Sequence, residues 1–164
     1  MDNEIGTLFL KASSAKLEQM TGYLNTCLGK LSDQQIWQRQ GAHENAVGNL
    51  ILHLSGNMRQ WIMHGVGGSP DVRTRDEEFS THRGLSVAQL LELFKQHVAE
   101  ANNVLATLPH PRLTERIHPQ NRDVTILEAI YQVVGHVQQH TGQIILLTKQ
   151  MTQKDLDLTI PRPR

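Results

Sequence analysis

Cysteine, proline and aromatic residues are scarce in this chain of 164 residues, which has 1 cysteine, 6 prolines and 4% aromatic residues. A single cysteine excludes an internal disulfide and the cysteine clusters of structural zinc sites. Cys27 lies within an apolar helical pattern, which predicts a buried core residue rather than a nucleophile. The sequence also lacks a run of about 18 apolar residues and a signal-peptide pattern. We therefore expect a soluble, cytoplasmic protein with no membrane partner.

Net charge is absent as well, because 16 basic and 16 acidic residues cancel. Phosphate binding favours a basic stripe, and the sequence shows none, so nucleic acid is not an expected partner. The 38% hydrophobic and 20% charged residues, without low-complexity runs, are typical of a globular protein. The length predicts a single domain over residues 1–158, followed by an extended tail at 159–164.

Helical periodicity dominates the sequence, with apolar residues recurring three and four positions apart. Asn45 is the expected N-cap of one helix, and Ser86 with Gln89 and Thr125 with Glu128 form the capping boxes of two others. No convincing strand alternation is visible. The sequence therefore predicts an all-α fold, a four-helix bundle. Its expected helices cover residues 3–30, 45–64, 86–108 and 125–151.

Two long connections separate these helices, at 65–85 and 109–124. The first is rich in glycine and then in charged residues. Loops of this length inside a compact domain are often functional or mobile. The pattern leaves two interpretations open: residues 65–85 cover a site beside the second helix, or they form a solvated excursion.

Histidine is the residue type that stands out, with 9 copies. His136 and His140 are four residues apart and lie one turn apart on one helix face, at the edge of its apolar sector. His53 occupies the same border position on the second helix. Three neutral imidazoles from facing helices can hold a divalent ion and leave a position for water or substrate. The spacing leaves open whether His53 meets the other two or whether all three only pack.

Other polar residues have plainer interpretations. Asn49, Gln60 and His64 share the helix face of His53, and we expect them on a shoulder that meets solvent. His97 in the third helix is expected to be a hydrogen-bonded shoulder histidine. A di-iron site of the bundle type needs two Glu-x-x-His motifs. The sequence has one, and a proline follows it directly, so we exclude such a site.

Three segments resemble the DinB family of DNA-damage-inducible four-helix bundles, which is related to the YfiT-like proteins. They are NLILHLSGNMRQWI at 49–62, the RDEEF turn at 75–79 and HVQQHTGQI at 136–144. The resemblance extends over nearly the whole chain in the order and spacing of the helices. It implies a bundle of the up-down-down-up type, which is often a homodimer.

The resemblance also implies a set of site residues. It implies that His53, His136 and His140 hold a divalent metal ion, most often zinc or nickel. Asn57 and Gln143 lie within about one turn of these ligands, so they are candidates for contacts to the ligands or to a substrate. Characterised members of the superfamily include thiol-dependent S-transferases and a thiol-dependent isomerase, in which the metal holds a thiolate. The resemblance therefore implies chemistry of this kind.

Two functional hypotheses follow. The first is a metal-dependent enzyme of the thiol-dependent S-transferase or hydrolase type, which uses a low-molecular-weight thiol or water against a small electrophilic substrate. The alternative is a non-catalytic metal-binding stress-response bundle that acts through dimerisation or partner binding. No general base is evident beside the three histidines, and Glu77, Glu78 and His82 in the 65–85 connection are the available candidates.

Overall fold

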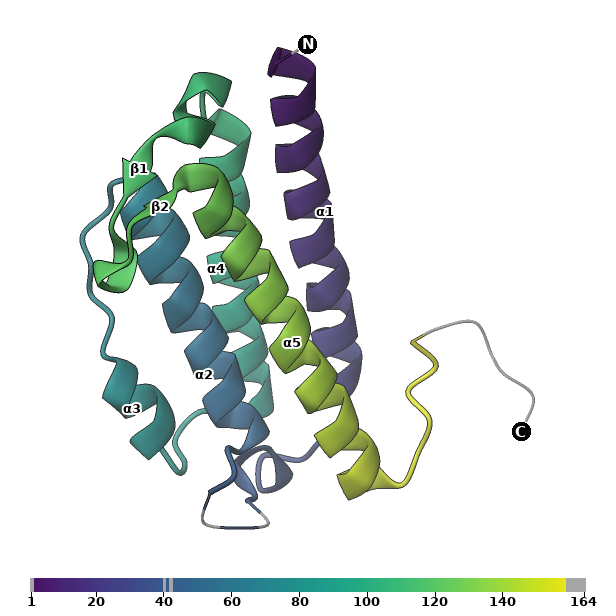
Figure 1. Cartoon of the computed structure of the whole chain (residues 1–164). Coiled ribbons are helices and arrows are strands. Elements are labelled where there is room, and N and C mark those ends of the chain that lie inside the picture. Colours follow the sequence, from purple (N-terminus) through teal and green to yellow (C-terminus); the bar gives the residue numbers. More distant parts are fainter. Residues whose placement is uncertain (1, 40, 42, 159–164) are drawn as a thin grey trace.

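The computed structural model describes residues 2–39, 41 and 43–158, and four long helices packed side by side make up most of them (Figure 1). The all-α bundle predicted from the sequence is confirmed. No helix in the described part of the chain is long and apolar enough to cross a membrane. The long helices are α1 (Asp2–Leu28), α2 (Val47–Met58), α4 (Val87–Thr107) and α5 (Ile126–Thr152), and the short α3 (Arg75–Ser80) accompanies them.

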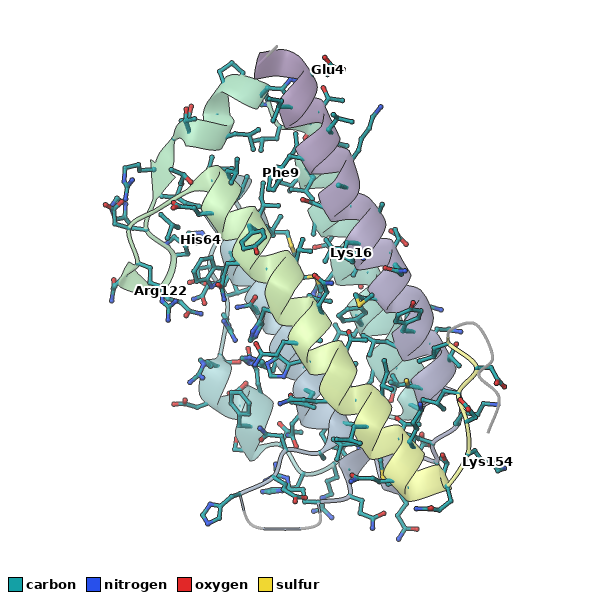
Figure 2. The ribbon with its side chains drawn as sticks, turned by 45° about the vertical axis from the view of Figure 1, so that its right-hand side comes forward. Glu4, Phe9, Lys16, His64, Arg122 and Lys154 are labelled. Atoms are coloured by element: carbon teal, nitrogen blue, oxygen red, sulfur yellow. The ribbon has the colours of Figure 1, made fainter. Side chains whose placement is uncertain are left out.

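The chain runs down α1, up α2 and α4, and down α5, as the resemblance implied (Figure 1). Each of α1 and α2 packs against both α4 and α5, so the core lies between all four helices. The rotated view of Figure 2 shows α1 and α5 lying side by side. The short α3 lies outside the bundle and contacts α2. The α2–α5 contact is the one that brings the histidines of two helices together.

The core is built from the apolar faces that the periodicity indicated. Fully buried side chains come from every long helix, and Cys27 is among them, as predicted. One expectation is wrong: His97 on α4 is only 6% exposed, and its Nδ1 has no hydrogen-bond partner among the described residues. Burial lowers its pKa, with Arg59 adding to this effect and Glu100 opposing it. Other core side chains that are at most 1% exposed include Leu24, Ile51, Leu54, Phe94 and Ile130.

Helix starts follow the local signals in two cases out of three. The hydroxyls of Ser86 and Thr125 accept from the backbone N–H groups three residues later, so both predicted capping boxes are present. The N-cap expected at Asn45 is wrong, because α2 begins at Val47 and Ala46 is its N-cap. Ala46 has no side-chain acceptor for the first-turn N–H groups, but Oδ1 of Asn49 accepts from the Ala46 N–H at 3.1 Å, which is the reciprocal bond of a capping box.

Both long connections contain more structure than the sequence indicated. The helix of α2 continues as a π-helix, η2 (Arg59–Val66), and α3 occupies part of the 65–85 connection. Two-residue strands in the second connection, β1 (Arg116–Ile117) and β2 (Val124–Thr125), pair antiparallel. Strands of two residues are too short to show alternation. The 3₁₀ turns are η1 (Gln35–Trp37), η3 (His110–Thr114) and η4 (Pro119–Asn121), and the tail expected at 159–164 lies outside the described residues.

Candidate metal centre

Three imidazoles from α2 and α5 converge at the edge of the core. Each of His53, His136 and His140 offers one ring nitrogen, and these three nitrogens lie within 4.8 Å of one another. The Nε2 atoms of His53 and His136 are 2.8 Å apart. His53 is buried, and the other two rings are half-buried. The structure thus brings together the three residues that the sequence singled out.

The outer nitrogen of His53 faces a carboxylate. Nδ1 of His53 lies 3.0 Å from Oε2 of Glu78, which comes from α3. Arg73 donates to both oxygens of this carboxylate, through Nε at 2.7 Å and Nη2 at 2.8 Å. Nη2 of Arg73 also lies 3.2 Å from this nitrogen, so Nδ1 has a donor and an acceptor beside it. The shorter contact, to the carboxylate, favours the Nδ1–H tautomer, which leaves the Nε2 lone pair directed toward the other histidines.

His140 is oriented in the same manner by an amide. Its Nδ1 lies 2.6 Å from Oε1 of Gln143, one turn further along α5. An amide oxygen accepts a hydrogen bond, so the proton of a neutral His140 ring sits on Nδ1 and its Nε2 keeps a free lone pair. Gln143, singled out from the sequence, therefore contacts one member of the trio. Asn57 follows His53 by one turn and is buried, but its Oδ1 has no hydrogen-bond partner among the described residues.

The electrostatics of the centre favour the neutral form of the two imidazoles from α5. Burial, together with the nearby His140 and His53, lowers the pKa of His136 to about 4. Burial also lowers the pKa of His140, against the opposing effect of its bond to Gln143. Burial alone would raise the pKa of Glu78, but hydrogen bonds from Arg73 and His53 outweigh it and hold that pKa below its usual value. At neutral pH the rings of His136 and His140 are therefore uncharged, and the Glu78 carboxylate of the same centre is ionised.

The donor set fits a divalent cation. Two neutral imidazole nitrogens 2.8 Å apart direct lone pairs at each other unless a proton or a cation lies between them. Three imidazoles are a donor set that zinc and nickel accept, and the outer nitrogens of two of them are held by hydrogen bonds, as is usual for metal-bound histidines. Among the described residues, no other His, Cys, Asp or Glu joins this group of three.

The residues proposed as a general base are placed differently by the structure. Glu78 is buried and paired with Arg73, which makes it a poor base. Glu77 is exposed and accepts from the Thr74 hydroxyl at 2.7 Å, and His82 is exposed as well. Sequence reasoning missed Arg73, whose side chain is only 2% exposed, and Phe79, whose ring packs 4.8 Å from the His53 ring. No periodicity marks either residue, because both lie outside the long helices.

Polar contacts from the bundle hold α3 in place. The Nδ2 atom of Asn49 donates to the backbone oxygens of Glu78 at 2.9 Å and Thr81 at 2.7 Å. Arg39 donates to Oδ1 of Asn49 at 2.9 Å and to the backbone oxygen of Phe79 at 2.8 Å. The prediction that Asn49 meets solvent is therefore wrong, since it is fully buried. The last carbonyls of a helix lack partners within it, and here Asn49 and Arg39 supply them.

The other two residues of the expected solvent shoulder are half-buried. Gln60 accepts from Nη1 of Arg73 at 3.0 Å and donates to Asp71 at 2.8 Å, so it extends the network around Glu78. His64 lies 2.6 Å from the Ser69 backbone oxygen through its Nδ1. Both residues belong to η2, a π-helix, and such segments often occur at functional sites.

A family model for a protein of unknown function, DUF1572, matches residues 4–164. The chain belongs to the DUF1572 family. No curated protein matches its sequence. Among solved structures, it is similar to a conserved protein from Enterococcus faecalis, with a TM-score of 0.72 and 15% identity over 88% of this chain and 97% of that chain.

Two further solved structures with this fold have names that indicate a family or an activity. A DinB-like protein from Bacillus cereus matches with a TM-score of 0.69 and 16% identity, over 87% of this chain and 90% of that chain. A mycothiol-dependent maleylpyruvate isomerase matches with a TM-score of 0.65 and 16% identity, over 82% of this chain and 60% of the isomerase. The resemblance to the DinB family is confirmed at the level of the fold.

Proposed function

We propose that this DUF1572 protein is a metal-dependent enzyme of the thiol-dependent S-transferase or hydrolase type, acting on a small electrophilic substrate. His53, His136 and His140 hold one divalent ion, zinc or nickel. The observation that carries the proposal is the convergence of three imidazoles, with Glu78 and Gln143 on the outer nitrogens of two of them. An oxygen that accepts a hydrogen bond from the outer nitrogen of a histidine, above all a carboxylate oxygen, makes the inner nitrogen a stronger metal ligand.

The size of the donor set favours a catalytic rather than a structural ion. Structural zinc sites take four protein ligands, whereas catalytic sites keep a position for water or substrate, and three imidazoles come together here. A divalent ion in such a site lowers the pKa of a bound thiol or water. Glu78 and Gln143 contact the outer nitrogens of His53 and His140 and orient these rings.

The transferase is the better supported of the two reaction types. Hydrolysis by a bound water normally uses a general base, and Glu78 is held ionised and occupied by Arg73. A thiol needs less help, because its pKa of about 8.5 lies far below that of water. The fold shared with a mycothiol-dependent isomerase also supports a low-molecular-weight thiol as co-substrate.

A homodimer is part of the same proposal. Large apolar side chains are exposed on the two adjacent helices α1 and α5, namely Ile5 at 66%, Leu8 at 60% and Tyr131 at 73%. Light scattering of the purified chain measures the mass directly. A monomer at micromolar concentration contradicts this part of the proposal and leaves the metal centre untouched.

Metal content and turnover, measured together, test the function. Untagged wild type, His136→Ala and the exposed control His118→Ala are analysed by plasma mass spectrometry and then assayed with cysteine, glutathione and an activated aryl halide. We expect about one ion per chain and metal-dependent conjugation in the wild type and the control, and neither in His136→Ala. Bound metal without turnover supports the non-catalytic metal-binding bundle instead. An active His136→Ala protein without metal refutes the metal centre.

A further inference from the structure

A cavity of about 360 Å³ lies between α2, α3 and α4. Arg73 and Glu78 line it, but none of the three histidines of the metal centre does, so the ion pair separates the two. The volume falls in the range of small-molecule sites. The walls combine apolar and polar groups, and several of the polar groups have no partner. The apolar side chains of the lining are Leu52, Val72, Leu85 and Leu93.

Two buried polar residues of the lining lack hydrogen bonds. Ser55 is 2% exposed and His97 is 6% exposed, and Oγ of Ser55 and Nδ1 of His97 have no partner among the described residues. Ser13 and Thr21 on α1 show the usual arrangement of a helical hydroxyl, because each donates to the carbonyl four residues earlier at 2.8 Å. A buried polar group without a partner costs free energy, so each one calls for an explanation.

Arg59 supplies a cation at the same cavity. It is exposed, lines the cavity, and makes no hydrogen bond or ion pair with a described residue. It lies close enough to His97 to help burial in lowering the pKa of that ring. The other charges of the lining are already engaged: Arg73 pairs with Glu78, and Glu77 accepts from Thr74. The unused groups are therefore a cation, a hydroxyl donor and a neutral imidazole.

We infer that this cavity binds a small carboxylic acid with an apolar body, whose carboxylate is held by Arg59, Ser55 and His97. Carboxylate oxygens accept from a guanidinium, from a hydroxyl and from the N–H tautomer of imidazole, so one group satisfies all three. The leucines and Val72 contact the apolar body. The site is independent of the metal and of the proposed transferase.

The test uses the 164-residue chain as purified, with its metal content measured, labelled with ¹⁵N. Benzoate and hexanoate are the probes, and benzamide is the neutral match of benzoate. Long-range ¹H–¹⁵N spectra follow the imidazole nitrogens of His97. We expect saturable shifts with the acids and weaker binding of benzamide. Arg59→Gln and Ser55→Ala each raise the Kd of benzoate by roughly threefold or more. Arg83→Gln, an exposed arginine, and Ser13→Ala, a buried serine elsewhere, leave it unchanged.

The inference is overturned if neither acid shifts the His97 signals at saturating concentration. It is also overturned if benzoate binds equally well to the Arg59→Gln and wild-type proteins, or no better than benzamide. His136→Ala, which removes a proposed metal ligand, serves as a second background and is expected to bind benzoate normally. Loss of metal and retention of benzoate in that variant separate this site from the proposed function.

Discussion

The Glu78 carboxylate lies 3.0 Å from Nδ1 of His53, so a short helix outside the bundle contacts the outer nitrogen of a core-edge histidine. Arg73 holds the carboxylate ionised and fixes it from the other side. The centre is therefore built by two helices of the bundle and oriented by the connection between α2 and α4. This arrangement leads to specific expectations for variants of the connection.

Removing the charge of Glu78 should weaken metal binding. We expect Glu78→Gln to lower zinc affinity by about tenfold, because an amide supports the ligand basicity of His53 less than a carboxylate does. Competition with a chromophoric chelator measures the affinity, and circular dichroism confirms that the protein remains folded. Glu77→Gln is the matched control one residue away and should bind zinc like the wild type. Equal affinities of Glu78→Gln and the wild type would show that the carboxylate does not tune the centre.

Gly56 is the contact point of Glu78 on α2. A Cβ at this position would collide with Oε1 of Glu78 and approach Nε of Arg73 to 3.2 Å. We expect Gly56→Ala to displace the carboxylate and to destabilise the protein by about 1–3 kcal/mol. Gly22→Ala on α1 is the control, since a Cβ there meets no atom within 4 Å. That substitution should stabilise the helix by roughly 0.5–1 kcal/mol. Urea unfolding measures both, and a neutral Gly56→Ala would contradict the close approach.

Burial of His97 predicts a pH dependence of stability. Its folded-state pKa lies below the ordinary 6.5, so the unfolded chain binds the proton more readily. The contribution of this group is constant above pH 6.5 and becomes increasingly destabilising as the pH falls below it. We expect His97→Gln to lose less stability than the wild type between pH 7.5 and 5.5 in urea unfolding. His118→Gln, on the surface, should keep the wild-type difference, and an unchanged difference in His97→Gln would contradict the burial effect.

The sequence was most informative where structure depends on neighbours along the chain. Apolar spacing located the long helices, and the capping boxes at Ser86 and Thr125 depend on residues only three apart. His136 and His140 share a helix face for the same local reason. Their proximity to His53 required the DinB resemblance, since packing of α2 against α5 joins positions 83 residues apart.

What the sequence did not show depends on contacts between distant segments. Asn49 has a polar side chain, which is typical of a residue that faces solvent. It is buried because the backbone oxygen of Glu78, 29 residues later in the chain, accepts a hydrogen bond from its amide. Glu77 and Glu78 were equivalent candidates, and the docking of α3 makes one exposed and the other buried. His97 and Ser55 lie on helices with ordinary periodicity, so their missing partners are visible only in three dimensions.

Asn49 attaches α3 to the bundle, so replacing Asn49 should loosen the packing of α3 against α2. Asn49→Leu removes hydrogen bonds to the backbone oxygens of Glu78 and Thr81 and leaves these carbonyls without a donor. We expect a loss of about 2–4 kcal/mol in the free energy of unfolding, because at least two buried hydrogen bonds are broken. Hydrogen exchange should accelerate selectively in residues 75–81, and zinc affinity should fall as Glu78 moves away from His53. Asn103→Leu, on the exposed face of α4, is the control. If exchange in α3 stays at the wild-type rate in Asn49→Leu, the bond from Arg39 to Phe79 and the Arg73–Glu78–His53 contacts hold the helix without Asn49.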